Sequence, residues 1–154
     1  KISSMMNLAY VRQGEPLGLG HAVLVTRDLV GDEPFAVILA DDVIDATPPA
    51  VKQLIDVFDR VQGPVLAVER VPRDEISSYG VIAPDLSVDL GEGIYQVKDL
   101  VEKPPKEEAP SDLAIIGRYI LTPDIFGALE TTKSDRTGEI QLTNGLRELL
   151  KTRP

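Results

Sequence analysis

Hydrophobic and polar positions along the chain follow two different periods. Segments with apolar residues every three or four positions predict amphipathic helices, and they lie at residues 19–29, 51–61, 125–129 and 140–150. Segments with continuous or alternating apolar residues predict strands, and they lie at residues 35–40, 65–68, 79–83, 94–101 and 113–121. Long apolar strands that alternate with helices predict a three-layer α/β fold.

Proline and glycine mark where several of these elements begin and end. Residues 47–49 (TPP) predict the start of the second helix, and residues 63–64 (GP) predict its end. Residues 122–123 (TP) predict the start of a short helix. The proline-rich and charged residues 103–110 predict a loop between the last two strands.

Both ends of the chain look interrupted. Residues 1–9 are expected to form the tail of a helix that runs into a short strand over residues 9–11, and residues 146–154 a helix without a cap. We therefore expect residues 1–154 to form a single domain that is the central portion of a longer chain. A length of 154 residues is enough to bury a sizeable core.

Composition narrows the class of protein. Hydrophobic residues make up 43% and charged residues 27%, and no apolar run approaches the roughly 20 residues that span a membrane. A cytoplasmic protein is therefore expected. With no cysteine and a single histidine, thiolate sites and multi-histidine metal sites are excluded. A net charge of −9 argues against a nucleic-acid-binding surface.

Two carboxylates follow the apolar run FAVILA directly. Asp41 and Asp42 stand where ligands collect in open α/β sheets, beyond the carboxyl end of a strand. Adjacent carboxylates repel one another unless they are solvated or hold a cation, and Mg²⁺ needs only one or two of them together with substrate phosphates. Asp41 is accordingly a candidate magnesium ligand, and a solvated turn is the alternative.

The segment Gly18-Leu19-Gly20-His21 has three competing interpretations. Glycines 18 and 20 followed by an aspartate about 20 residues later imitate a dinucleotide-binding fingerprint. The third glycine of that pattern is replaced by Val23, and the preceding strand is short. His21 has no evident partner for nucleophilic catalysis, so a packed helix-start residue is its simplest interpretation. The third interpretation is a loop that holds a flat ring against bare backbone.

A further charged pair, Glu102-Lys103, lies at the predicted end of a strand and before a stiff Pro-Pro loop. Such a pair is usually a surface salt bridge that contributes little to stability. If the strands that end near Asp41, Gly80 and Glu102 are neighbours, these residues line one crevice.

Several of these strings occur in an order that resembles one family. VRQGEPLGLGHAV, FAVILADD, SYGVI, VEKP, LAIIGRYIL and TGEIQLT follow one another from about residue 9 to residue 150. The chain is similar in this to bacterial UTP–glucose-1-phosphate uridylyltransferases, of the sugar-nucleotidyltransferase group. The resemblance implies a Rossmann-like nucleotidyltransferase fold with a mixed, mostly parallel sheet. It also implies Mg²⁺ as cofactor, UTP and glucose 1-phosphate as substrates, and a homo-oligomer.

The resemblance also implies roles for single residues. Gln13 would hydrogen-bond the uracil edge, and Gly18 would let the base approach the main chain. Asp41 would bind magnesium, and Lys103 would meet the phosphate of glucose 1-phosphate. The implied sugar-site residues are Gly80, Glu102 and Gly117.

The chain departs from the family pattern in three places. It lacks the N-terminal glycine-rich loop that clamps the triphosphate, and the later aspartate that completes the metal site. Asn144-Gly145 also stands where the family commonly has Asp-Ala. The alternatives are a non-catalytic sugar-nucleotide-binding module, an enzyme for another sugar phosphate or nucleotide, and a nicotinamide dehydrogenase.

Overall fold

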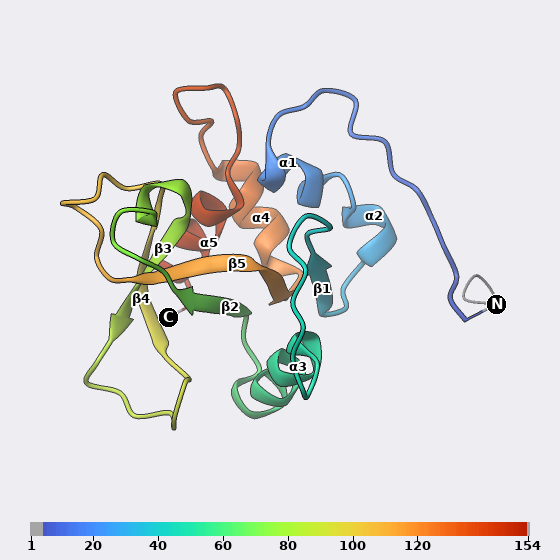
Figure 1. Cartoon of the computed structure of the whole chain (residues 1–154). Helices are drawn as coiled ribbons and strands as arrows, with labels where there is room; N and C mark the ends of the chain where they lie inside the picture. Colours follow the sequence, from blue (N-terminus) through green and yellow to red (C-terminus); the bar gives the residue numbers. More distant parts are fainter. Residues whose placement is uncertain (1–4, 154) are drawn as a thin grey trace.

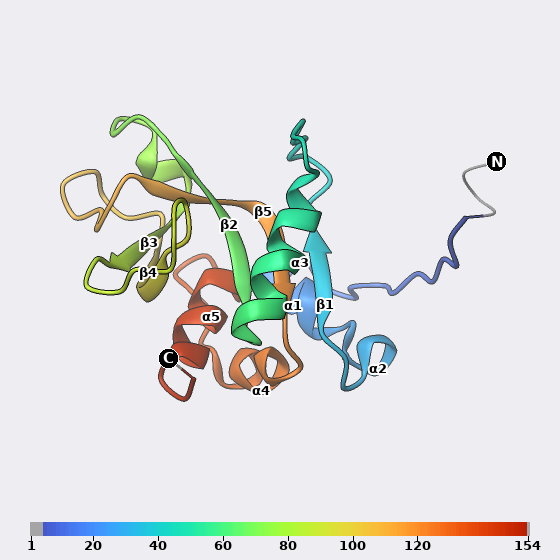
Figure 2. The ribbon, with the colours of Figure 1, turned by 90° about the horizontal axis from the view of Figure 1, so that it is seen from below.

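The computed structural model describes residues 5–153 and contains a five-stranded sheet with helices on both sides (Figures 1 and 2). The strands are β1 (Phe35–Ile38), β2 (Val65–Arg70), β3 (Gly80–Asp85), β4 (Gln96–Glu102) and β5 (Leu113–Leu121). The helices are α1 (Leu19–Leu24), α2 (Arg27–Val30), α3 (Ala50–Val61), the 3-10 helix η2 (Ile76–Ser78), α4 (Asp124–Thr131) and α5 (Leu142–Leu150).

Strand β5 organises the sheet. It pairs with β1 and β2, and also with β3, which in turn pairs with β4. All of these pairings, within residues 5–153, are antiparallel. The expected three-layer α/β arrangement is confirmed, but the expectation of a mostly parallel sheet is wrong. Strands β1 and β2 run parallel to one another but do not pair, because β5 lies between them and runs in the opposite direction.

The main core lies between the sheet and helices α1, α4 and α5 (Figure 1). Ile125, Phe126 and Leu129 of α4 are buried, as their spacing predicts. The ring of Phe126 stacks on that of Phe35 in β1, with 5.3 Å between their centroids. Helix α3 packs against β2 and β5 on the other side of the sheet (Figure 2).

Two predictions, for β1 and for the helix before it, differ from the structure. The continuous apolar run FAVILA predicts a strand that is covered on both faces. In the structure it is covered on one face only, and Ile38 is 55% exposed, because α3 packs on β2 and β5 rather than on β1. The helix expected over 19–29 is divided into α1 and α2 at Thr26, whose hydroxyl donates to the main-chain oxygen of Val23 at 2.7 Å.

The N-terminal segment is less regular than the sequence suggests. Residues 9–11, expected as a strand, have no strand partner within the described part of the chain. Of the expected helix tail, residues 1–4 lie outside the described residues and residues 5–9 are not helical. None of the helices between residues 5 and 153 has the length and hydrophobicity that a bilayer crossing requires.

Candidate functional site

Gln13 is the centre of the loop that leads into α1. Its side-chain nitrogen Nε2 donates to the main-chain oxygen of Gly18 at 3.1 Å, and it lies 3.0 Å from Nδ1 of His21. Gly18 has a φ of 92°, in the region that glycine adopts at no steric cost. The two residues expected to hold a nucleotide base are thus joined by a direct hydrogen bond.

The glycines of this loop pack against another part of the same chain. A Cβ atom added to Gly18 would lie 2.9 Å from the main-chain oxygen of Ile140, and one added to Gly20 would lie 2.6 Å from that oxygen. Hydrogen bonds join the two segments, from the N–H of Ile140 to the oxygen of Leu17 (2.7 Å) and from the N–H of Gly20 to the oxygen of Ile140 (2.8 Å). The fold alone therefore requires these glycines, and the base-binding role of Gly18 stays a prediction.

The two aspartates after β1 have different surroundings. Oδ2 of Asp42 accepts a 2.8 Å hydrogen bond from the main-chain N–H of Gly117 in β5. The side chain of Asp41 is exposed and has no hydrogen bond or ion pair to any residue between 5 and 153. The hydrogen bond of Asp42 fastens the turn to β5, so Asp41 is the carboxylate that is available to a ligand.

Arg118 reinforces the same turn from inside the protein. It is 9% exposed, and its guanidinium donates to the main-chain oxygens of Leu39 (2.9 Å), Gly117 (2.7 Å) and Asp42. Three carbonyl dipoles thus surround the buried positive charge. These contacts fix the direction in which the chain leaves β1, and with it the position of Asp41.

Gly117 has little freedom to bind a ligand. A Cβ atom at this position would lie 2.6 Å from Cβ of Leu39, so only glycine fits. Its N–H is bonded to Asp42, and its oxygen accepts from the N–H of Leu39 at 2.9 Å and from Arg118. The resemblance implies only that Gly117 lies in the strand that closes the sugar pocket, and its main-chain N–H and oxygen are already hydrogen-bonded within the protein.

Gly80 and Glu102 face one another where β3 and β4 pair. A Cβ atom on Gly80 would lie 3.1 Å from Oε2 of Glu102 and 2.7 Å from Oγ1 of Thr143 at the start of α5. The side chain of Glu102 is 20% exposed, so it is still accessible from the surface. The structure therefore brings two of the predicted sugar-site residues together and adds Thr143 to them.

Lys103 follows Glu102 in an unusual backbone conformation. Its φ is 43°, and its N–H donates to the oxygen of Tyr79 at 3.0 Å. Such a conformation in a non-glycine residue costs of order 1–3 kcal/mol and is concentrated at functional sites. The side chain is 60% exposed and its Nζ lies 4.0 Å from Oε1 of Glu102, which is at most a weak ion pair. Lys103 is therefore positioned by its backbone, with its ammonium free to meet an anion.

Tyr119 links the two groups of residues. Burial raises the pKa of its phenol to about 12, and the negative charges of Glu102 and Asp42 add to this rise. The phenol is thus influenced by the charge of one carboxylate at the end of β4 and of another in the turn after β1. That Asp41, Gly80 and Glu102 line one crevice stays a prediction, and Gly80 lies at the start of β3 rather than at the end of a strand.

The segment 139–143 connects the loop around Gln13 to the start of β3. Ile140 is hydrogen-bonded to Leu17 and Gly20, and the hydroxyl of Thr143 lies against Gly80. Residues more than 60 positions apart are thus held by one short segment. The candidate site is built from the Gln13–His21 loop, the turn after β1, the start of β3, the end of β4, and this connecting segment.

Sequence reasoning did not find the contacts that four residues make in this site. Arg118 and Tyr119 interrupt the apolar run of β5, and buried polar residues in such a run are a signal that points to specific partners. The sequence indicates a turn at Asp42, but its hydrogen bond with Gly117 spans 75 positions and leaves no local signal. Nothing in the local sequence distinguishes Thr143.

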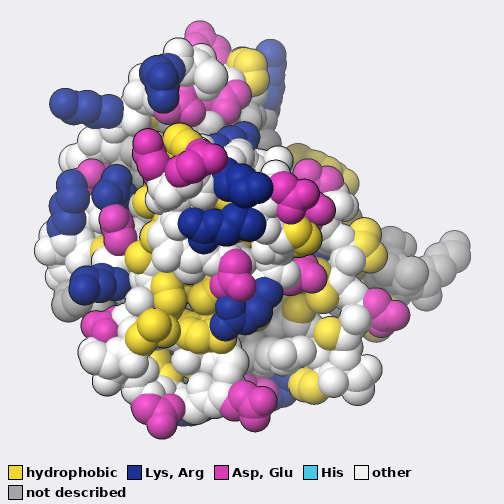
Figure 3. Space-filling view, turned by 60° about the vertical axis from the view of Figure 1, so that its left-hand side comes forward, with side chains coloured by type: hydrophobic (Ala, Val, Ile, Leu, Met, Phe, Trp, Pro, Cys, Tyr) yellow, Lys and Arg dark blue, Asp and Glu magenta, His cyan; other side chains and the backbone are white. Residues whose placement is uncertain are grey.

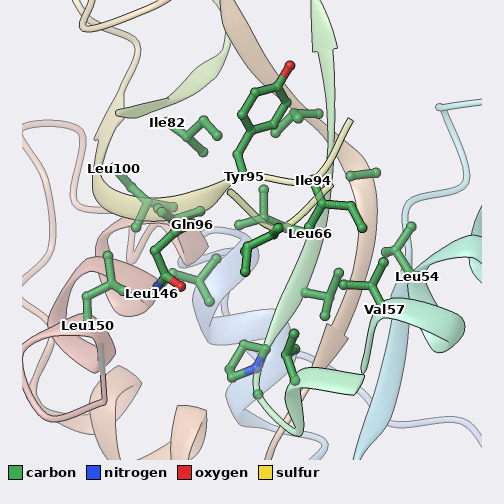
Figure 4. A pocket seen from close by; sticks show the side chains of 18 of the residues that line it. Leu54, Val57, Leu66, Ile82, Ile94, Tyr95, Gln96, Leu100, Leu146 and Leu150 are labelled. Atoms are coloured by element: carbon green, nitrogen blue, oxygen red, sulfur yellow. The ribbon is translucent and has the colours of Figure 1, made fainter. Parts of the chain in front are cut away.

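A separate apolar cavity lies away from these residues. Its volume is about 620 Å³, and none of the predicted site residues lines it. Leu54 and Val57 on α3 lie across it from Leu146 and Leu150 on α5 (Figure 4).

Figure 3 shows one face of the molecule on which acidic and basic side chains are interspersed around a hydrophobic patch.

Comparison with known proteins supplies the family. The model of the nucleotidyl transferase family matches residues 1–153. The chain belongs to this family. The nucleotidyltransferase fold that the sequence resembles is therefore confirmed, although the pairing within the described sheet is antiparallel.

Among its relatives in this family are enzymes of one named activity. The chain is 48% identical over 150 residues to the UTP–glucose-1-phosphate uridylyltransferase of Bacillus subtilis, covering 97% of the chain and 50% of the relative. It is 47% identical over 154 residues to a second such enzyme of that organism, YngB, of which it covers 51%. The chain thus spans about half the length of these curated relatives.

Solved structures of the family have the same fold. A UDP-glucose pyrophosphorylase complexed with UDP-glucose is 50% identical with a TM-score of 0.88, and the match covers 94% of this chain and 55% of that one. A UTP-bound enzyme of this type from Acinetobacter baumannii is 37% identical with a TM-score of 0.77, over 92% of this chain and 48% of that one. These relatives bind UDP-glucose and UTP respectively.

Proposed function

We propose that this chain carries the uridine- and glucose-binding part of an enzyme that makes UDP-glucose and pyrophosphate from UTP and glucose 1-phosphate. The observation that carries the proposal is the corner at the end of β4, where Gly80, Glu102 and the strained Lys103 offer a carboxylate and an ammonium side by side. The similarity to relatives with this named activity supports it.

In this proposal the two ends of the site hold the two substrates. Gln13 and Gly18 take the uracil base at the loop before α1. Glu102 accepts hydrogen bonds from glucose hydroxyls beside Gly80, because an ionised carboxylate is an acceptor only. The ammonium of Lys103 holds the phosphate of glucose 1-phosphate through a charge-assisted hydrogen bond.

Asp41 is suited to hold a magnesium ion. Its carboxylate is exposed and has no partner within residues 5–153, and Mg²⁺ in such enzymes takes one or two carboxylates together with substrate phosphates and water. Residues 5–153 contain no group of three or more His, Cys, Asp or Glu side chains that could form a site by itself. When bound, the ion would neutralise phosphate charge.

The reaction needs little chemistry from side chains. An oxygen of glucose 1-phosphate attacks the α-phosphorus of UTP, a new phosphorus–oxygen bond forms, and the bond to the β-phosphate breaks to release pyrophosphate. The attacking phosphate is already ionised at neutral pH, so no strong base is required. Positioning and charge neutralisation then account for catalysis, and a chain with one histidine and no cysteine is sufficient for this.

Lys103→Ala tests the proposal, with Lys98→Ala as a matched control. Lys98 is an exposed lysine on β4, the strand that ends directly before Lys103. A charge-assisted contact is worth about 1.5–3 kcal/mol, so Lys103→Ala should lower kcat/KM for glucose 1-phosphate roughly ten- to a hundredfold. The melting temperature should change little, because exposed ion pairs contribute at most about 1 kcal/mol.

Lys98→Ala should leave both quantities unchanged. Steady-state kinetics and melting curves of the two variants in the protein that carries this chain decide the matter. Equal kinetics for wild type and Lys103→Ala would remove Lys103 from the sugar-phosphate site. Saturable UDP-glucose binding without turnover would instead favour a non-catalytic binding module.

A further inference from the structure

We propose that His21 is a positioning residue that fixes the side-chain amide of Gln13, so that the loop accepts uracil and rejects cytosine. The inference rests on the proposed function, because it concerns how the same loop reads its base. It is carried by three atoms: Nε2 of Gln13, the main-chain oxygen of Gly18 and Nδ1 of His21.

The oxygen of Gly18 determines which end of the Gln13 amide faces the loop. A main-chain carbonyl is an acceptor only, so the amide atom 3.1 Å away must be the NH₂ group rather than the amide oxygen. Gly18 is itself held in place by its φ of 92° and by the close approach of Ile140. The acceptor that orients Gln13 is therefore part of a rigid turn.

The tautomer of His21 follows from this orientation. Nδ1 of His21 lies 3.0 Å from the same NH₂ group, which can only donate. Nδ1 must then carry the lone pair, and the ring proton of the neutral imidazole resides on Nε2. Both N–H groups of the Gln13 amide are used, one by Gly18 and one by His21.

The remaining atom of the amide, Oε1, is an acceptor that has no hydrogen-bond donor among residues 5–153. Uracil presents an N–H at position 3 of its ring, which matches an acceptor. Cytosine presents a lone pair at that position, which would face the lone pairs of Oε1. A site that is built to receive one pattern of donors strongly disfavours a base that lacks it.

His21 matters because two hydrogen bonds, to Gly18 and to His21, hold the Gln13 amide in its orientation more firmly than the bond to Gly18 alone. With both bonds in place, turning the amide over to offer its NH₂ to cytosine breaks two hydrogen bonds. Without an acceptor at position 21, the same rotation breaks only the bond to Gly18. The loop then discriminates less between the two bases, although Gln13 is still present.

Two substitutions of His21 separate this role from a packing role. His21→Leu retains a side chain of roughly similar size but removes the acceptor, whereas Asn in His21→Asn can place its Oδ1 near the position of Nδ1. A neutral hydrogen bond is worth a factor of about five to ten, so His21→Leu should lower the preference for UTP over CTP by about that factor. His21→Asn should retain the preference, and the KM for glucose 1-phosphate should not change in either variant.

The experiment is isothermal titration of UTP and of CTP into the purified protein and both variants, with nitrogen NMR of the imidazole as a second readout. An unprotonated Nδ1 in the free protein and loss of base preference only in His21→Leu are the expected results. A protonated Nδ1, or an unchanged preference in His21→Leu, would overturn the role of His21 while the proposed function stands. Failure of the wild-type protein to bind either nucleotide would overturn both.

Discussion

Asp41 and Asp42 are adjacent in sequence, and the structure predicts opposite consequences for their loss. Asp42→Ala removes the acceptor for the N–H of Gly117, a bond of 2.8 Å between the turn after β1 and the central strand. Asp41→Ala removes an exposed carboxylate that has no partner within residues 5–153. The first change should destabilise the fold, and the second should affect only ligand binding.

The size of the first effect can be worked from the bond itself. Hydrogen bonds to charged groups contribute about 1.5–3 kcal/mol, and the N–H of the buried Gly117 would be left without its acceptor. For a chain of this size, 1 kcal/mol corresponds to roughly 2–4 °C, so Asp42→Ala should lower Tm by about 3–12 °C. Asp41→Ala should stay within about 0.5 kcal/mol of wild type.

Thermal and urea unfolding followed by circular dichroism measure both effects. Asp42→Asn provides a graded control, because its amide oxygen can still accept from Gly117 without the charge, and it should lie between wild type and Asp42→Ala. A magnesium titration of enzyme activity completes the comparison, and Asp41→Asn should require far more Mg²⁺ than wild type. Equal Tm values for Asp41→Ala and Asp42→Ala would refute the division of roles.

Two further predictions concern titrating groups. The phenol of Tyr119 has a pKa of about 12, so the stability it contributes is complete below about pH 10 and is lost as the pH rises toward 12. The phenolate absorbance that is absent in Tyr119→Phe should appear in that range, and a midpoint near 10 would contradict its burial. Hydrogen bonds from Thr137 and Gln141 lower the pKa of Asp135, whose stabilising effect is therefore present above about pH 4 and is lost as the pH falls through its lowered value. Amide hydrogen exchange at the adjoining segment 139–140 should become faster at neutral pH in Asp135→Ala. Asp85→Ala is the control, because it removes the carboxylate of a similar turn at the end of β3, and it should leave exchange at 139–140 unchanged. Equal exchange rates in both variants would argue against this local role of Asp135.

The sequence was sufficient for elements whose pattern is local. The run of β5 and the spacing of α3 and α4 gave their positions to within a few residues, because burial imposes its period on the chain directly. The half-exposed face of β1 could not be predicted in this way. Its apolar run is compatible with cover on both sides, and the distribution of α3 over β2 and β5 is a tertiary property.

In the candidate site, too, local features could be predicted from the sequence and contacts between distant segments could not. Asp41, Glu102 and Lys103 could be proposed because charged residues that follow apolar strands are visible in the sequence. The hydrogen bond from the N–H of Gly117 to Asp42 joins two segments 75 positions apart, so no local pattern reveals it. The antiparallel pairing of the strands could not be predicted for the same reason, since residues distant in the sequence determine which strands pair and in which direction.

The glycines of the Gln13 loop show how one pattern can have two causes. Bare backbone at Gly18 suggests room for a flat base, and the structure fills that room from one side with Glu139 and Ile140. Gly18→Val would therefore disturb the fold as well as the base site. Substitutions of Gln13, whose Oε1 has no donor among residues 5–153, test base binding more cleanly.

The central claim is that this chain holds both halves of UDP-glucose, and equilibrium binding of UDP-glucose to the purified protein tests it most directly. Isothermal titration should give saturable binding at one site per chain, with competition from both UMP and glucose 1-phosphate. Gln13→Ala should weaken the competition by UMP and leave that by glucose 1-phosphate, and Glu102→Ala should do the reverse. Absence of binding, or binding that neither substitution changes, would contradict the account.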